Sequence, residues 1–186
     1  KETGDMAIMD VKAPYINGPQ ESLYAHCKRA IEKVFTRFSP RGIPLMGDHD
    51  WNDGLSAVGT EMKGESFWVA EFLYMILENF IPLSIERNDI AFAEKCQDVR
   101  KNLKVAMNQY GWDGNWYLQA TTDDGLLLGS HTNDEGKIFL MPNNWAVISK
   151  IADDKRAKTA MKHVSEHLLK DYGTLLNYPA FTKPRT

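Results

Sequence analysis

Cysteine is scarce in this sequence: Cys27 and Cys96 are the only two among 186 residues, and they lie far apart. Their spacing matches neither a disulfide framework nor a metal-binding or redox motif. Each falls on the apolar side of a segment with helical periodicity. We therefore predict two buried free thiols in a reducing compartment, and hence a cytoplasmic protein.

Runs of one charge and long apolar runs are also missing. The chain carries 22 Lys and Arg against 25 Asp and Glu, a net charge of -3 at pH 7. Because no basic run is interleaved with aromatic residues, we expect no nucleic-acid partner. No apolar run is judged long enough to cross a bilayer, so we expect no membrane segment. The first residues are polar and begin with Lys1, which predicts no signal peptide and an excised or processed piece.

Apolar residues recur at helical spacing through most of the chain. Five helices are predicted: residues 22–38, residues 65–86, a helix from Asn88 or Asp89 to Ala106, a short helix from Asn143 or Asn144 to Ile151, and one from Asp153 or Asp154 to Leu168. Pro82 is expected to kink or end the second helix. That helix is apolar nearly all round, whereas the third has one wet face. The alternation predicts a mainly α fold with inner and outer layers of antiparallel helix hairpins.

Two regions depart from this helical period. Residues 116–121 alternate between two faces, residues 123–125 read Asp-Asp-Gly, and an apolar run follows, which predicts a small β-hairpin. Residues 1–20 contain Pro14, Gly18 and Pro19, so we expect an irregular lead-in. The tail after Gly173 is also expected to be irregular.

The most polar stretch is a loop between two glycines. It reads Gly47-Asp48-His49-Asp50-Trp51-Asn52-Asp53-Gly54. A carboxyl group beside an indole and other carboxylates can have a raised pKa and donate a proton near neutral pH. The same residues are also common in ordinary turns and helix caps. A calcium loop fits less well, because its sixth position is Asp53 instead of Gly and its twelfth is Gly59 instead of Glu. We therefore expect no metal.

The sequence resembles glycoside hydrolase family 94 along nearly its whole length. That family holds the inverting β-glucoside phosphorylases and the phosphorylase-like domain of cyclic β-1,2-glucan synthases. The motifs that carry the resemblance are residues 42–55 with Asp50-Trp51-Asn52-Asp53, residues 63–66 (Lys-Gly-Glu-Ser), residues 4–15, residues 111–117 (Gly-Trp-Asp-Gly-Asn-Trp-Tyr), residues 135–140 and residues 145–148. His49 stands where a small residue is expected.

The resemblance implies an (α/α)6 toroid of six helix hairpins, of which residues 1–186 form an incomplete part of one catalytic domain. It implies phosphorolysis of a β-linked gluco-oligosaccharide with inversion, giving a sugar 1-phosphate, with phosphate as co-substrate and no cofactor. Asp53 is the implied general acid and Trp51 the implied wall of the sugar subsite. Asn52, His49 and Glu135 are further candidates for substrate contacts. Glu65 is expected to favour the start of the second helix electrostatically.

Two other functions stay open at this stage. An inverting hydrolase on the same toroid would need a second carboxylate to activate water. A sugar-binding or scaffold piece would need no chemistry. The chain shows no Gly-rich loop with Lys and no Arg cluster that could cradle phosphate, so we expect it to be inactive by itself. Its apolar inner helix also predicts association with the remainder of its parent domain or with a second copy.

Overall fold

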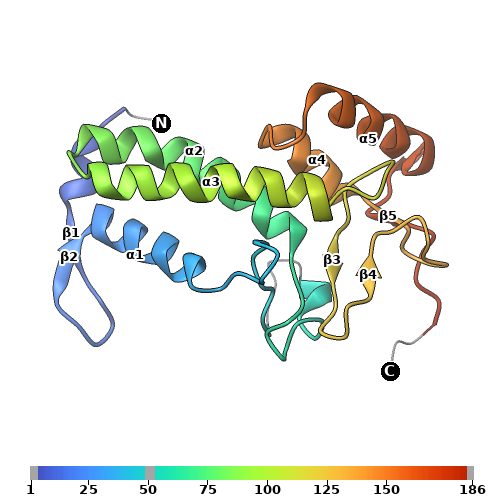
Figure 1. Cartoon of the computed structure of the whole chain (residues 1–186), viewed down its shortest axis with the longest axis horizontal. Helices are drawn as coiled ribbons and strands as arrows, with labels where there is room; N and C mark the ends of the chain where they lie inside the picture. Colours follow the sequence, from blue (N-terminus) through green and yellow to red (C-terminus); the bar gives the residue numbers. More distant parts are fainter. Residues whose placement is uncertain (1–3, 49–52, 184–186) are drawn as a thin grey trace. The chain divides into compact units, whose positions relative to one another are not determined.

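The computed structural model describes residues 4–48 and 53–183 (Figure 1). Its helices confirm a mainly α fold, and the short strands occur as isolated pairs. Two compact units make up the chain, Lys1–Phe38 and Ser39–Thr186. The predicted catalytic loop belongs to the second unit.

The first unit is a short hairpin followed by one helix. Its elements are the 3-10 helix η1 (Met6–Asp10), strands β1 (Lys12–Pro14) and β2 (Gln20–Ser22), and helix α1 (Leu23–Phe35). Residues 1–20, expected to be irregular, thus contain a 3-10 helix and a paired strand. Ser22 caps α1 by accepting a hydrogen bond from the Ala25 N–H at 3.2 Å. Cys27 lies on the exposed side of this helix, so the prediction that it is buried is wrong.

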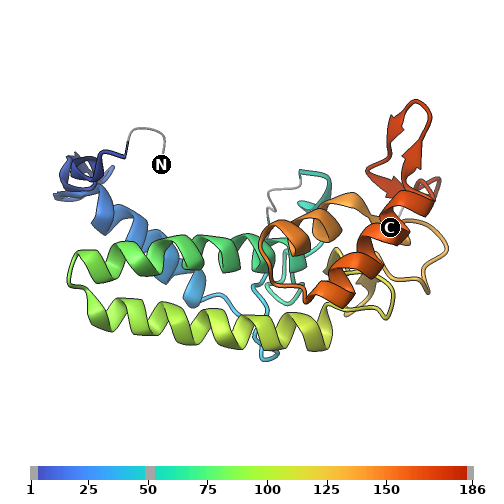
Figure 2. The same ribbon diagram turned by 90° about the horizontal axis from the view of Figure 1, so that it is seen from above.

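The second unit is built around a long helical hairpin. Its elements are η2 (Asp53–Leu55), α2 (Phe67–Glu86), α3 (Ile90–Tyr110), β3 (Ala120–Thr121), β4 (Leu127–Leu128), β5 (Ile138–Phe139), α4 (Leu140–Ile148), α5 (Asp154–His167), β6 (Leu169–Lys170), β7 (Gly173–Thr174) and β8 (Asn177–Tyr178). Helices α2 and α3 run side by side in opposite directions in both views, and α4 packs on α2 and α5 (Figures 1 and 2).

Helix α2 is the most buried helix because it has apolar residues on nearly all sides. Phe67 and Leu77 are fully buried, and Trp68 stacks on Phe72 at 5.5 Å between ring centroids. Ser66 caps the helix by accepting a hydrogen bond from the Val69 N–H. The helix continues past Pro82 to Glu86, so of the two effects expected of the proline, a kink or an end, it does not end the helix at that residue.

By length and composition alone, α2 is long and apolar enough to cross a membrane. The expectation that no segment reaches this length is therefore wrong. Core helices pass the same test, and Phe67, Leu73 and Leu77 of α2 are buried inside the second unit. A role in the core accounts for the composition of this helix.

Two more predictions on helix ends have clear outcomes. Helix α5 follows Asp153, whose side chain accepts a hydrogen bond from the Arg156 N–H at 2.9 Å, as predicted. Helix α4 begins at Leu140, before the predicted caps, and Asn143 is buried inside it. The Asn143 side chain accepts from the Tyr117 N–H and donates to the Phe139 carbonyl, so it joins α4 to the strand region.

The predicted β-hairpin is present, with one difference in burial. Strands β3 and β4 pair antiparallel around residues 122–126, and Gly125 has a φ of 86° in the turn. Residues 116–121 are buried on both faces, so the expected division into two differently exposed sets does not occur. The tail is irregular only in part: β8 returns to pair with β5, whereas residues 179–183 belong to no helix or strand.

Candidate functional site

Most of the predicted site residues fall in the gap between residues 48 and 53. His49, Trp51 and Asn52 lie outside the described residues. Asp53 begins η2, and its backbone is described but its side chain is not. The predicted roles of these four residues stay predictions.

The base of this loop is closed by backbone pairing. Leu45 and Glu65 form an isolated antiparallel bridge, and the Met46 N–H donates to the Gly64 carbonyl at 2.8 Å. Gly47 then turns the chain with a φ of 75°. Residues 46–64 thus form a loop whose two ends are held together, which fixes where the polar motif leaves the core.

A cavity of about 800 Å³ opens directly after Asp53. Its walls come from the site loop, the β3–β4 hairpin and the C-terminal segment. The lining residues are Gly54, Leu55, Ala57, Val58, Glu61, Lys63, Thr122, Asp123, Asp124, Leu126, Leu128, Phe181 and Lys183. Below it, Met46, Ala120 and Leu128 form a buried apolar cluster on which Leu55 and Val58 pack. An apolar base with charged groups at the walls is a common composition for a small-molecule site.

Asp123 holds the site loop against the hairpin. Its carboxylate accepts hydrogen bonds from the backbone N–H groups of Glu61, Lys63 and Gly64 at 2.8 to 2.9 Å. Desolvation acts to raise the pKa of Asp123, but these three donors and the Lys63 charge outweigh it and lower the pKa. The sequence predicted only a turn here. The Asp123 carboxylate therefore also orders the cavity wall that contains Glu61 and Lys63.

Two glycines allow this close approach. A Cβ atom on Gly64 would lie 2.8 Å from the Thr121 carbonyl oxygen, and one on Gly59 would lie 2.9 Å from Cβ of Met46. Neither neighbour can move without breaking the loop base. The Gly-Glu-Ser motif therefore needs its glycine for packing of the loop on β3.

Glu65 lies buried behind the cavity wall and pairs with Arg41. The Arg41 Nε–H donates to Glu65 Oε1 at 3.0 Å, and a second guanidinium nitrogen contacts Oε2. The Glu65 N–H donates to the Thr121 hydroxyl at 3.0 Å. The expected role of Glu65 at a helix start is therefore revised. Ser66 caps α2, and Glu65 links Arg41 to Thr121 through its side chain and its backbone N–H.

Glu71, the fifth residue of α2, is also fully buried, but without an ion pair to a described residue such as the one Glu65 has. Among the described residues, neither of its carboxyl oxygens has a hydrogen-bond partner, and the same holds for the side-chain amide of buried Gln119. Burial raises the pKa of Glu71 well above its ordinary value. Burial without a described hydrogen-bond partner therefore favours the neutral form of this carboxyl group. Composition and periodicity gave no signal for this group, because a single Glu in an apolar helix ordinarily faces water.

Glu135 does not belong to the described lining of the cavity. Its carboxylate accepts a hydrogen bond from the Thr182 hydroxyl, which lowers its pKa. Thr182 lies between Phe181 and Lys183, two residues that do line the cavity. The structure thus places Glu135 next to Thr182 of the C-terminal segment. Its predicted contact with substrate stays a prediction.

Ser130, His131 and Asp113 form a second polar group. The Asp113 carboxylate accepts from the His131 backbone N–H at 2.6 Å and contacts its ring Nδ1 at 2.7 Å. It also accepts from the Ser130 hydroxyl at 3.1 Å. The contacts run in the order Ser130 hydroxyl, Asp113 carboxylate, His131 ring, and among the described residues no hydrogen bond joins the hydroxyl to the imidazole. This order stabilises a turn and does not make a nucleophile–base pair.

The fold and cavity together define a mainly α domain with a carboxylate-rich loop beside a polar-walled pocket. The family model of the glycosyl hydrolase 94 superfamily, catalytic domain, matches residues 1–186. The chain therefore belongs to that superfamily.

Curated relatives agree with this assignment. The chain is 36% identical to a solabiose phosphorylase of Paenibacillus borealis over 98% of its length, and covers 24% of that protein. It is 34% identical to an N,N'-diacetylchitobiose phosphorylase of Vibrio furnissii over 99% of its length, and covers 23% of it. The chain thus spans about a quarter of the length of these relatives.

A solved structure extends the likeness to the fold. A GH78 family rhamnosidase of Bacillus sp. GL1 superposes with a TM-score of 0.62 over 77% of this chain and 14% of that protein, at 15% identity. At this identity the match concerns the helical architecture alone.

Proposed function

We propose that this chain is part of the catalytic domain of an inverting β-glycoside phosphorylase, with Asp53 as the general acid. The observation that carries the proposal is the position of Asp53. It stands in the Asp-Trp-Asn-Asp motif and directly precedes Gly54 and Leu55, which line the cavity. Both relatives described above are named as phosphorylases. Phosphorolysis requires one carboxylic acid for the leaving oxygen, because phosphate itself is the nucleophile.

Trp51 is assigned to one wall of the sugar subsite, with Asn52 and His49 as polar neighbours. Asp123 and the loop base support this assignment indirectly, because they hold the backbone on either side of the motif. The substrate class is a β-linked disaccharide or oligosaccharide with inorganic phosphate. The parent domain is proposed to be an (α/α)6 toroid in the cytoplasm.

The three carboxylates in the described lining of the cavity all have a partner, which supports phosphorolysis over hydrolysis. Asp124 accepts a hydrogen bond from the Thr122 hydroxyl. A hydrolase with inversion needs a free carboxylate base about 6.5–9.5 Å from the acid. Asp123 accepts three backbone hydrogen bonds, and its lowered pKa makes it a weak base. Glu61 forms an ion pair with Lys63 at 2.7 Å. Glu135 stands outside the described lining.

The test is Asp53→Asn in the full-length polypeptide. Turnover of an unactivated β-disaccharide with phosphate should fall by at least ~100-fold, the scale expected for loss of a general acid. A nitrophenyl β-glycoside needs no protonation of its leaving group and should lose much less. Asp98→Asn, the same change on the exposed face of α3, is the matched control and should keep the activity.

The products separate the remaining functions. Sugar 1-phosphate formed only with phosphate supports the proposal. Free sugar released at the same rate without phosphate would make the protein a hydrolase. Sugar binding with no turnover by the wild type would leave a binding or scaffold role. Full activity of Asp53→Asn on the unactivated disaccharide would contradict the assigned acid.

A further inference from the structure

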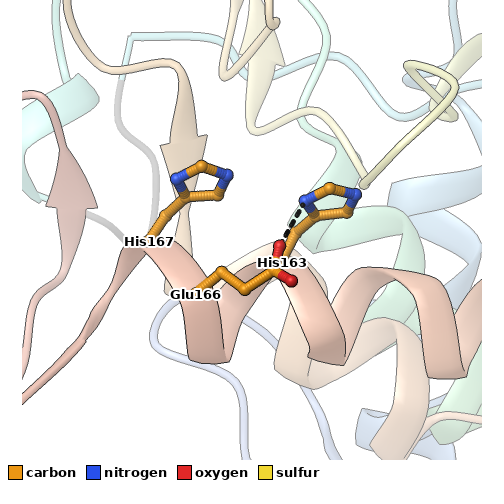
Figure 3. A group of neighbouring side chains, drawn as sticks. All are labelled: His163, Glu166 and His167. Carbon is orange, nitrogen blue, oxygen red and sulfur yellow. Dashed lines mark ion pairs between the residues drawn. The ribbon is translucent and has the colours of Figure 1, made fainter.

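The last two turns of α5 carry two histidines and a glutamate on one side. His163, Glu166 and His167 follow the spacing His-x-x-Glu-His. One ring nitrogen of each histidine and one carboxylate oxygen all lie within 4.8 Å of one another. Figure 3 shows both imidazoles projecting from the same side of the helix, with the Glu166 carboxylate directed toward His163. His163 Nδ1 and Glu166 Oε2 are 3.4 Å apart.

The indole of Trp116 packs against both imidazoles. Their rings are parallel within 6°, with centroids 5.7 Å apart, and each meets the Trp116 ring edge-on at 5.2 and 5.8 Å. Trp116 is itself fixed, because its ring N–H contacts the carbonyls of Gly129 and Lys137 at 2.8 and 2.9 Å. The histidines therefore share a rigid support and lose little conformational freedom if a ligand joins them.

The group is partly open to solution, although His163 Nδ1 itself is covered. The side chain of His163 is 21% exposed and that of Glu166 is 48% exposed. His167 lines a small cavity of about 270 Å³ together with Asp134. Nothing in the proposed sugar chemistry uses these residues, and the site loop lies on other elements.

We propose that His163, Glu166 and His167 bind a divalent transition-metal ion of the zinc class. Imidazole nitrogens with one carboxylate suit zinc, cobalt and nickel, whereas magnesium and calcium prefer sites made of oxygen. Tetrahedral zinc with bonds of about 2.0–2.1 Å needs ligand atoms roughly 3.4 Å apart. The described ligand atoms lie within 4.8 Å of one another, so binding would draw them closer, chiefly by movement of the exposed Glu166 side chain. Three protein ligands leave the fourth position to water.

This proposal departs from the expectation, drawn from the cysteines and the site loop, that the chain binds no metal. The same motif spacing occurs in a class of zinc peptidases, in which the glutamate is the base. Here the Glu166 carboxylate lies against His163, so we assign it as a third ligand. The metal would connect His163 to Glu166 and His167, three and four residues further along α5. Its binding would stabilise the folded state by mass action.

The experiment uses the complete chain without a histidine tag, freed of metal by chelation. Titration with ZnCl2 in a calorimeter should give one saturable site per chain and raise Tm. CoCl2 should give the visible absorption bands of a four-coordinate nitrogen and oxygen site. MgCl2 should do neither. Zinc uptake with no defined stoichiometry, or no uptake, would overturn the proposal.

Variants then locate the site. His167→Ala should abolish the saturable binding, and Glu166→Gln should weaken it by at least ~10-fold, the scale for losing a carboxylate at a metal site. His163→Phe removes the nitrogens but keeps a ring against Trp116, so a folding defect is separated from lost ligation. His26→Phe in the first unit is the matched control. Unchanged zinc affinity in His163→Phe and His167→Ala would show that the metal binds elsewhere.

Discussion

Glu65 and Glu71 are both buried and lie six positions apart, yet their surroundings are opposite. Glu65 precedes α2 and contacts the Arg41 guanidinium and the Thr121 hydroxyl. Glu71 lies inside α2, where the described residues offer its oxygens no hydrogen-bond partner. In the first region the Glu65 side chain is paired with Arg41, and this pairing positions the backbone at the start of α2. In the second region burial favours the neutral form of the carboxyl group. Burial alone therefore does not decide what an acidic residue does.

The largest effect is expected from Arg41→Met. This change keeps most of the aliphatic stem and leaves the Glu65 charge buried without its ion pair. The free energy of unfolding should fall by roughly 3 kcal/mol, the lower end for breaking a buried pair from one side. Chemical denaturation with an unchanged m-value is the measurement.

The reverse change tests whether the asymmetry is real. The Arg41 side chain is 41% exposed, so Glu65→Gln leaves a cation that water can solvate. Its cost should be smaller, about 1–2 kcal/mol for a lost buried hydrogen-bond acceptor. The double variant should cost less than the sum of the two. Equal costs for both single variants would contradict this account.

Glu71→Gln should raise the free energy of unfolding relative to the wild type, and the size of this gain should depend on pH. The pKa of Glu71 is raised in the folded state, so this group lowers stability as pH rises above its unfolded value and the loss levels off above the folded pKa. Between these limits the wild type should lose up to about 1.4 kcal/mol per pH unit relative to the variant. Below about pH 4 the two should converge.

The comparison is made by urea unfolding of both proteins at several pH values. Lys95→Met on the exposed face of α3 serves as a surface control, and its difference from the wild type should not follow this profile. Parallel pH profiles for the wild type and Glu71→Gln would mean that the carboxyl group is charged in the folded protein.

Asp123→Asn should give the smallest effect and the most local one. The amide keeps one acceptor oxygen, so at least one of the three backbone N–H groups of residues 61–64 loses its partner. Hydrogen exchange of these amides should quicken while exchange in α2 and α3 stays slow. The pKa of Asp123 is lowered on folding, so its contribution is present above about pH 4 and is lost as pH falls through the folded value.

The helices were predictable because their cause is local. Spacing of apolar residues located α1, α2, α3 and α5, and the caps Ser66 and Asp153 stand where the chain enters them. The start of α4 was missed because Asn143 resembles a cap, while its bonds go to Tyr117 and Phe139. The pairing of β8 with β5 depends on residues far apart in sequence, which periodicity cannot supply.

Of the candidate functional site, only the sequence motif could be predicted. Composition and family resemblance located the loop that carries Asp53, and the cavity beside Gly54 and Leu55 is consistent with it. The other walls were not visible in the sequence. Asp123 looks like an ordinary turn residue until the turn is folded against residues 61–64, and Lys183 reaches the cavity from the tail.

The different exposure of the two thiols has a practical consequence. Cys96 is fully buried, whereas Cys27 is exposed on α1. A maleimide dye should therefore attach to the first unit alone in the folded protein, without any engineered cysteine. The same thiol can cross-link two chains in air, so any oligomer seen by gel filtration has to survive a reducing agent before it counts as assembly.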